Sequence, residues 1–277
     1  MAVPTERWKV RRAAARLLGD LLTLTATEDA PNGNPALFKD ARNLSVDSSR
    51  TVNWQGVVVR STAPENLWFR TRLESSSRAT ETATLDPPLP TWTRGGDQMD
   101  VFMHRGTGWR PEEYDGAIND AIAQLDKKYT QDTTFETVEG FDPYSPLIVV
   151  PDDWVGVYRV EYQLSDGLWV DITEPFELDQ ENHAVRIGWN DSGYMRGRVA
   201  KVYGKKQWPE LLEDEDTTRV PLGFLQYTVA SMLLMSGAHR QVERETENKA
   251  LFFNQRASEF MEQVGGRLPS NIQWFAQ

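Results

Sequence analysis

The sequence predicts an α+β fold in which N-terminal, central and long C-terminal helices form a helical bundle, with β-barrel- or β-sandwich-like insertions. Two observations support this prediction. Apolar residues recur with a helical period in three separate stretches, and they alternate with a period of two in the stretches between them. The predicted parts are a helical core (1–22, 106–129 and 217–265), a first β region (23–105), a second β region (130–212) and a C-terminal tail (266–277).

The first predicted helix is amphipathic and basic. Its apolar stripe begins at Val10 and ends at Leu21, and five basic residues against the single carboxylate of Glu6 leave this segment with a net charge of +4. Three interpretations remain open: a solvated face, docking onto an acidic protein surface, or contact with DNA phosphates. The basic residues are Arg7, Lys9, Arg11, Arg12 and Arg16.

The first β region shows strands divided by turns. Val57 and Val59 alternate with Val58, and residues 67–73 alternate in the same way. Stretches rich in Pro, Gly, Asn and Ser separate such runs, as expected for turns between antiparallel strands. These stretches are 31–35, 75–77, 87–90 and 95–97.

The central helix is the best-marked element of the sequence and covers residues 106–128. Pro111 suits a first helical turn, and an apolar stripe runs from Tyr114 to Leu125. We expect this stripe to face the helices predicted at 5–22 and 221–238, so that Ile118 and Ile122 are buried. Trp109, just before the helix, is a candidate interaction residue.

The second β region contains a predicted hairpin. Residues 158–162 alternate, 165–167 (Ser-Asp-Gly) form a turn, and a further alternating run follows over 168–172. Additional short strands are predicted at 176–178, 185–189 and 198–203.

The C-terminal part begins with an acidic run at 210–216, which we interpret as a solvated loop or helix lead-in. Residues 221–264 are predicted to be helical, as one long helix or as two that meet near Gly237. The uncharged stretch 222–238 is too short and polar for a membrane span, which favours a buried or interface helix. Two aromatic residues near the end of the chain indicate docking on a neighbour. Candidate interaction residues here are Leu222, Phe224, Leu225, Met232, Trp274 and Phe275.

Composition and motifs argue against catalysis. The chain has no cysteine, which excludes thiolate zinc sites and cysteine nucleophiles, and its net charge of −11 argues against a dedicated DNA-binding protein. The histidines His104, His183 and His239 are far apart, and no nucleophile elbow, zinc-protease motif or phosphate loop is present. A glycosidase-like carboxylate pair remains open, although nothing singles one out. The prediction is a non-enzymatic protein with no catalytic residue, cofactor or metal.

Several segments of the sequence carry a family resemblance, namely 16–20, 25–27, 38–40, 43–44, 95–97, 109–114, 117–119, 121–122, 157–162 and 166–169. The segments at the opening of the chain resemble the start of phage head-to-tail connector, adaptor or neck proteins. Trp109 with the following residues resembles their central helix, and the second β unit and the C-terminal helix are also similar.

The resemblance implies a structural virion protein that assembles in the host cytoplasm as a homo-oligomeric ring, with twelve copies expected. Such a ring would join the portal protein to downstream neck or tail proteins at the neck. It would line part of the channel through which double-stranded DNA leaves, without sequence-specific binding and without a membrane partner. A tail or baseplate component is the alternative. A carbohydrate-binding or hydrolysing β-domain protein is a more remote alternative, suggested by ten tryptophans and abundant carboxylates.

Overall fold

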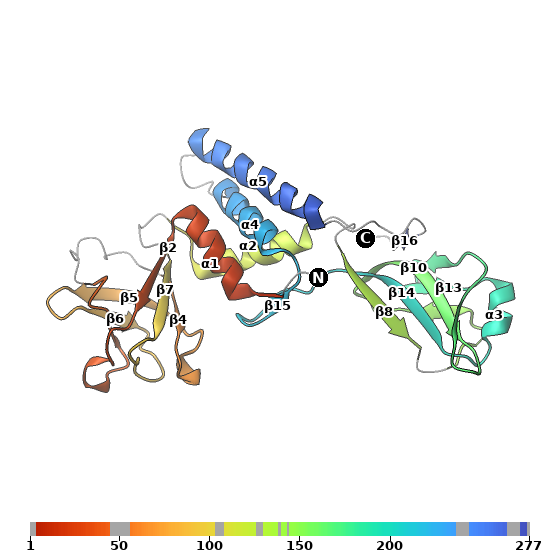
Figure 1. Cartoon of the computed structure of the whole chain (residues 1–277), viewed down its shortest axis with the longest axis horizontal. Coiled ribbons are helices and arrows are strands. Elements are labelled where there is room, and N and C mark those ends of the chain that lie inside the picture. The colour runs from red at the N-terminus through yellow and green to blue at the C-terminus, as the bar shows by residue number, and fades with distance from the viewer. Residues whose placement is uncertain are drawn as a thin grey trace. The chain divides into compact units, whose positions relative to one another are not determined.

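The computed structural model describes two compact units (Figure 1). Unit 1 comprises residues 1–122 and 210–264, and unit 2 comprises residues 123–209 and 265–277. The residues described are 4–44, 56–102, 108–125, 130–137, 140–142, 144–236, 244–264 and 272–275.

The predicted fold class, a helical bundle with β insertions, is wrong. The described residues form 16 strands in four sheets and five helices, with nearly equal shares of strand (31%) and helix (30%). The reason is that each β region buries its alternating apolar residues against other strands of the same region, and so forms an apolar core of its own. The first β region also belongs to the same compact unit as the long helices.

Unit 1 contains an antiparallel six-stranded sheet with the order β2-β7-β4-β5-β6-β3. The chain just after the first strand meets the last strand, because the backbone N–H of Thr27 donates to the carbonyl of Lys39 at 3.0 Å. The sheet therefore curls around a core that includes Leu24, Phe38 and Met99. The strands are β2 (Leu21–Thr25), β3 (Leu37–Lys39), β4 (Gly56–Arg60), β5 (Arg70–Ser77), β6 (Thr82–Asp86) and β7 (Gln98–Phe102), with short 3-10 turns at Pro31–Gly33 and Pro64–Asn66.

Four helices and a small two-stranded sheet complete unit 1. The predicted C-terminal helix is two helices; Gly237 lies outside the described residues. Ser231 of α4 donates to the carbonyl of Ala250 of α5 at 2.9 Å, and a side chain at Gly223 would collide with Phe260, so these two helices pack closely. The elements are β1 (Thr5–Glu6), α1 (Arg7–Leu18), α2 (Pro111–Ala123), β15 (Thr217–Thr218), α4 (Leu222–Ser236) and α5 (Arg244–Val264).

Unit 2 consists of a five-stranded and a three-stranded antiparallel sheet around one apolar core. The predicted hairpin is confirmed, since β10 and β11 pair antiparallel across a turn at Gly167, whose φ is +87°. The strand predicted at 185–189 ends at Arg186, and a short helix follows. The elements are β8 (Gln131–Glu136), β9 (Leu147–Val149), β10 (Trp154–Gln163), β11 (Trp169–Asp171), β12 (Glu177–Asp179), β13 (Ala184–Arg186), α3 (Trp189–Met195), β14 (Ala200–Lys206) and β16 (Gln273–Trp274).

Candidate interaction surfaces

Two of the five basic residues of α1 are buried in unit 1. Arg11 is 2% exposed, and its guanidinium lies 2.8 Å from Asp115 of α2 and 2.7 Å from Asp214. Arg7 donates to the carbonyl of Leu211 at 2.8 Å and lies 3.5 Å from Asp214. The structure therefore uses these two cations to join α1, α2 and the segment before α4, and their charges do not face a partner at the surface of the monomer.

The acidic run at 210–216 is only partly the solvated loop that the sequence predicts. Asp214 is buried between the two arginines, because the run passes along α1 and pairs with it through β1 and β15. Asp216 accepts two backbone hydrogen bonds at 2.7 Å, and Glu215 accepts one from the indole of Trp68 at 3.1 Å. A run of acidic residues is solvated only where no buried cation lies close to it. The sequence does not show that Arg11 is buried beside this run.

The other basic residues of α1 lie nearer to solvent. Arg12 shares the carboxylate of Asp100 with Arg60, each at 3.1 Å, and burial lowers the pKa of Arg12. The ring of the half-buried Trp8 is flanked by Lys9, Arg12 and Arg60, with cation-to-centroid distances of 5.3 to 5.7 Å. Lys9 and Arg16 are exposed, so they remain the candidates on this helix for contact with an anionic partner.

Within α2 the apolar stripe is buried as the sequence predicts, with Ile118 at 0% and Ile122 at 5% exposure. The helix ends at Ala123, so the last predicted member of the stripe, Leu125, lies beyond it and is half-buried. Tyr114 belongs to the same stripe, and its hydroxyl donates to Asp20 at 3.0 Å. Trp109, a predicted interaction residue, is half-buried; its backbone N–H donates to Asp20 at 2.7 Å, and its ring meets Tyr114 edge-on. Trp109 therefore helps to fix the start of α2, with part of its surface left accessible.

The helices α4 and α5 expose apolar side chains. They run antiparallel, because Ser231 contacts Ala250 while Tyr227 packs against Phe253 and Phe260. Met235 near the end of α4 and Leu251 and Phe252 in the first half of α5 are 50 to 62% exposed. We call Met235, Leu251 and Phe252 the hairpin face. Of the predicted residues, Leu225 is buried, whereas Leu222, Phe224 and Met232 are half-buried.

The last described residues, 272–275, lie on unit 2 of the same chain. Trp274 and Gln273 of β16 pair with Gly156 and Val157 of β10. Phe275 is 3% exposed and joins the apolar core of the unit. The sequence predicts that these aromatics dock on a neighbour; in the single chain they dock on unit 2 of the same chain.

The outer face of the five-stranded sheet carries a charged and aromatic network that the sequence analysis missed. Arg159 binds Asp171 at 2.6 Å and Glu161 at 2.5 Å, and Tyr203 donates to Glu161 at 2.6 Å, which raises the pKa of the tyrosine. Lys201 pairs with Glu136 at 2.7 Å, a hydrogen bond that raises the pKa of the lysine. The only sequence signal was alternation, which placed these polar residues opposite the apolar face of each strand.

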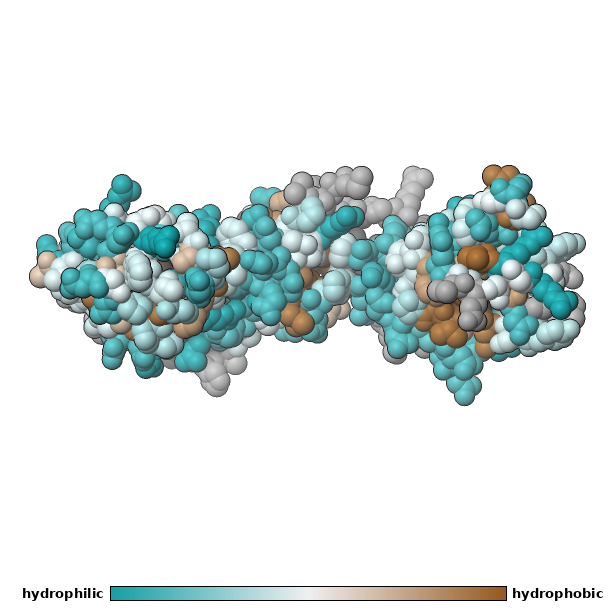
Figure 2. Space-filling model, turned by 90° about the horizontal axis from the view of Figure 1, so that it is seen from below, coloured by the Kyte–Doolittle hydropathy of each residue, from teal (hydrophilic) through white to brown (hydrophobic). Residues whose placement is uncertain are grey.

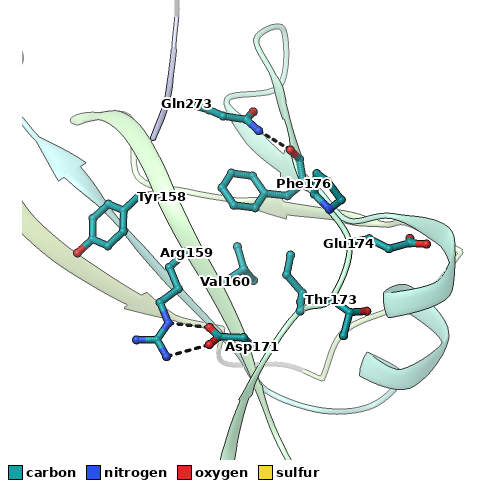
Figure 3. A pocket seen from close by; sticks show the side chains of 10 residues that line it. Tyr158, Arg159, Val160, Asp171, Thr173, Glu174, Phe176 and Gln273 are labelled. Atoms are coloured by element: carbon teal, nitrogen blue, oxygen red, sulfur yellow. Dashed lines mark hydrogen bonds and ion pairs between the residues drawn. The ribbon is translucent and has the colours of Figure 1, made fainter. Parts of the chain in front are cut away.

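Beside this network, Figure 3 shows a pocket of about 470 Å³ in unit 2. Arg159 and Asp171 close one side by their two hydrogen bonds, and Phe176 and Val160 form an apolar wall. Gln273 reaches the pocket from β16 and donates to the carbonyl of Phe176 at 2.5 Å. The carboxylates that line the pocket are Asp171 and Glu174. Asp171 is held by the guanidinium of Arg159 through two hydrogen bonds, so it is not placed as an independent member of an acid–base pair.

The described ranges contain no cluster of three or more His, Cys, Asp or Glu side chains that could hold a metal ion. Of the histidines, His183 belongs to unit 2, while His104 and His239 lie outside the described residues. Within the same ranges, no helix is long and apolar enough to cross a membrane. No protein-family model matches the chain, and no curated protein is significantly similar to it.

Proposed function

We propose that this chain is a structural virion protein of a tailed phage that forms a ring and connects the portal to the tail. The observation that carries the proposal is the hairpin face, because three large apolar side chains of one helix pair are exposed. Exposed apolar residues that occur singly are ordinary, whereas several on one helix pair point to a surface that an assembly covers. The resemblance of the sequence to connector proteins supplies the kind of assembly.

The charge distribution supports a passage for DNA better than a binding site for it. The net charge of −11 opposes stable binding of the phosphate backbone. Two of the five cations of α1 are buried in ion pairs inside unit 1, and a third, Arg12, is half-buried against Asp100. The two exposed cations are Lys9, which pairs with Glu6, and Arg16. A connector needs this property, because its channel must let the genome pass without holding it.

In the proposed assembly, the partners are other copies of the chain, with twelve expected, the portal protein above the ring and neck or tail proteins below it. The protein would be assembled in the host cytoplasm and retained at the neck of the virion. No catalytic step, cofactor or membrane is part of the proposal. Electron microscopy of the purified protein with and without its portal tests the proposal. Rings that cap the portal are expected, and a folded monomer that does not bind the portal overturns the proposal.

A tail or baseplate component is the second candidate from the same class, since the hairpin face would serve that assembly equally well. Rings that form but bind tail proteins in place of the portal would favour it.

A carbohydrate-binding protein is the candidate from another class, and the pocket in unit 2 is the observation in its favour. Its wall combines the ring of Phe176 with the polar groups of Arg159 and Thr173. Calorimetric titration with host cell-wall oligosaccharides tests this function. Saturable binding that Arg159→Ala abolishes would support it, and no heat of binding would exclude it.

A further inference from the structure

We infer that the edge of β10 is a strand-binding site and that, in the assembled protein, residues 272–275 of a neighbouring copy occupy it. We call the acceptor, formed by Val155–Val157 with His183 and the carbonyl of Phe176, the β10 slot. The inference rests on the proposed function for the presence of neighbours. The geometry of the slot is independent of that function.

The backbone of the slot is shaped for a strand that carries a large side chain. Trp274 lies opposite Gly156, Gln273 lies opposite Val157, and the N–H of Phe275 donates to the carbonyl of Val155 at 2.9 Å. A β-carbon at Gly156 would lie 2.7 Å from the Trp274 ring and 2.8 Å from the Gln273 carbonyl oxygen. Glycine is therefore needed at this position for the two backbones to approach with the indole between them.

Side chains anchor both ends of the docked strand. Phe275 is 3% exposed and stacks on the imidazole of His183, with ring centroids 4.0 Å apart. His183 has a φ of +46°, a left-handed conformation that a non-glycine residue adopts only where its surroundings hold it. At the other end, Gln273 donates to the carbonyl of Phe176 at 2.5 Å. The slot thus recognises an aromatic residue, a glutamine amide and the backbone between them.

The partners described above for the docked strand all lie in unit 2, although the chain reaches the strand from α5 of unit 1. These contacts are the same whether the strand comes from the same chain or from a neighbouring copy. An exchange of strands between copies therefore keeps all of them. This is the condition under which identical elements are exchanged at low cost in free energy.

A ring also requires a head-to-tail contact between two different surfaces of each copy. The strand and the β10 slot form such a pair, because one copy donates the strand and accepts another strand at a separate place. A second copy is therefore the occupant that fits both the slot and the proposed assembly. An exchanged strand adds main-chain hydrogen bonds to the apolar contact that the hairpin face provides.

Disulfide trapping tests the exchange, because the chain has no cysteine of its own. Val157 and Gln273 are direct partners in the antiparallel register, a spacing that a disulfide accepts. The double variant Val157→Cys/Gln273→Cys is oxidised as assembled protein and analysed on a non-reducing gel. A ladder of covalent oligomers is expected, and bonds within single chains only overturn the inference.

Mixing the two single variants, one of them carrying a size tag, gives the sharper form of the test. A tagged–untagged disulfide between positions 157 and 273 is expected. In the double-cysteine background, Gly156→Val is expected to abolish the bond between chains, whereas Gly193→Ala, where an added β-carbon meets nothing within 4 Å, keeps it. If the cysteine at 157 prevents folding, a photoreactive benzoylphenylalanine at position 274 leaves β10 intact and reports which chain it touches.

The outcomes separate this inference from the proposed function. Rings with bonds inside each chain overturn the strand exchange and leave the connector proposal standing. Monomers with bonds inside each chain overturn both. Disulfide-linked pairs of chains that form no closed ring support the strand exchange and overturn the proposal that the protein forms a ring.

Discussion

Unit 1 and unit 2 each fasten a chain segment that is remote in sequence, and they do so by opposite means. Unit 1 holds the segment before α4 through buried charges, with Arg11 between Asp115 and Asp214. Unit 2 holds residues 272–275 through backbone pairing and the burial of Phe275. Buried ion pairs need every partner, because a charge left alone in the interior is costly. A docked strand needs a shaped edge and one apolar anchor, which another copy of the chain can also supply.

The largest effect is expected where the ionic attachment of unit 1 is broken. Arg11→Met keeps much of the side-chain volume but leaves Asp115 and Asp214 without this cation, so we expect unfolding free energy to fall by about 3–5 kcal/mol. Urea unfolding followed by circular dichroism measures it. Arg16→Met, on the exposed side of the same helix, is the control and should change stability by less than about 0.5 kcal/mol. Equal unfolding free energies of Arg11→Met and Arg16→Met would contradict the expected difference between the buried and the exposed arginine.

A smaller loss is expected where the anchor of the docked strand is removed. Phe275→Ala should cost about 3 kcal/mol, the lower end for a buried phenylalanine, because the strand can leave the slot without unfolding the unit. The chain has ten tryptophans, so the emission of Trp274 is obtained as the difference between each protein and its Trp274→Phe variant. This emission should shift to longer wavelength as the ring becomes solvated. Tyr144→Ala, at an 83% exposed position of unit 2, is the control that should change neither signal. An unshifted spectrum in Phe275→Ala would show that the aromatic anchor does not hold the strand.

An alkaline titration tests the hydrogen bond between Tyr203 and Glu161 on the outer face of the five-stranded sheet. The hydrogen bond to Glu161 raises the pKa of Tyr203 above its ordinary 10.0, so the protonated hydroxyl is favoured in the folded state. Its contribution to stability is complete below pH 10 and is lost as the pH rises through the raised pKa. The stability difference between wild type and Tyr203→Phe, from urea unfolding at each pH, should therefore be constant below pH 10 and shrink above it. A difference that stays constant above this pH would show that the hydroxyl is not coupled to the fold.

The smallest effect is expected at an exposed ion pair. Arg256 and Glu259 of α5 are one turn apart at 2.8 Å, and both side chains are largely solvated. Glu259→Gln should lower unfolding free energy by only about 0.2–0.5 kcal/mol, and added salt should remove the difference. A loss as large as that of Arg11→Met would mean that burial does not distinguish the two kinds of pair.

The local pattern of the sequence predicted the elements better than their assembly. The stripe around Ile118 and the hairpin at Gly167 follow from periodicity and turn chemistry, and both are present. The fold class was wrong, because periodicity shows which face of a strand is buried and leaves open whether helices or other strands cover it.

The candidate surfaces could be predicted only in part. Two large aromatics near a terminus predicted docking on a neighbour, whereas in the single chain Trp274 and Phe275 dock on unit 2. The need for glycine at 156 was hidden, because it depends on a contact 118 residues away. The burial of Arg11 was hidden for the same reason, since Asp115 lies 104 residues along the chain. Contacts of this range are set by the tertiary fold, and no spacing in the sequence encodes them.

The central claim, that the hairpin face is covered in a ring, is tested most directly by the oligomer mass of a matched pair of variants. Phe252→Glu and Asn254→Glu add the same charge to exposed positions two residues apart on α5, and only the first lies in the hairpin face. Mass photometry of wild type and Asn254→Glu, alone and with portal, should show a single closed oligomer that Phe252→Glu reduces to monomers. Wild-type protein that stays monomeric in both conditions, or rings that survive Phe252→Glu, would contradict the claim.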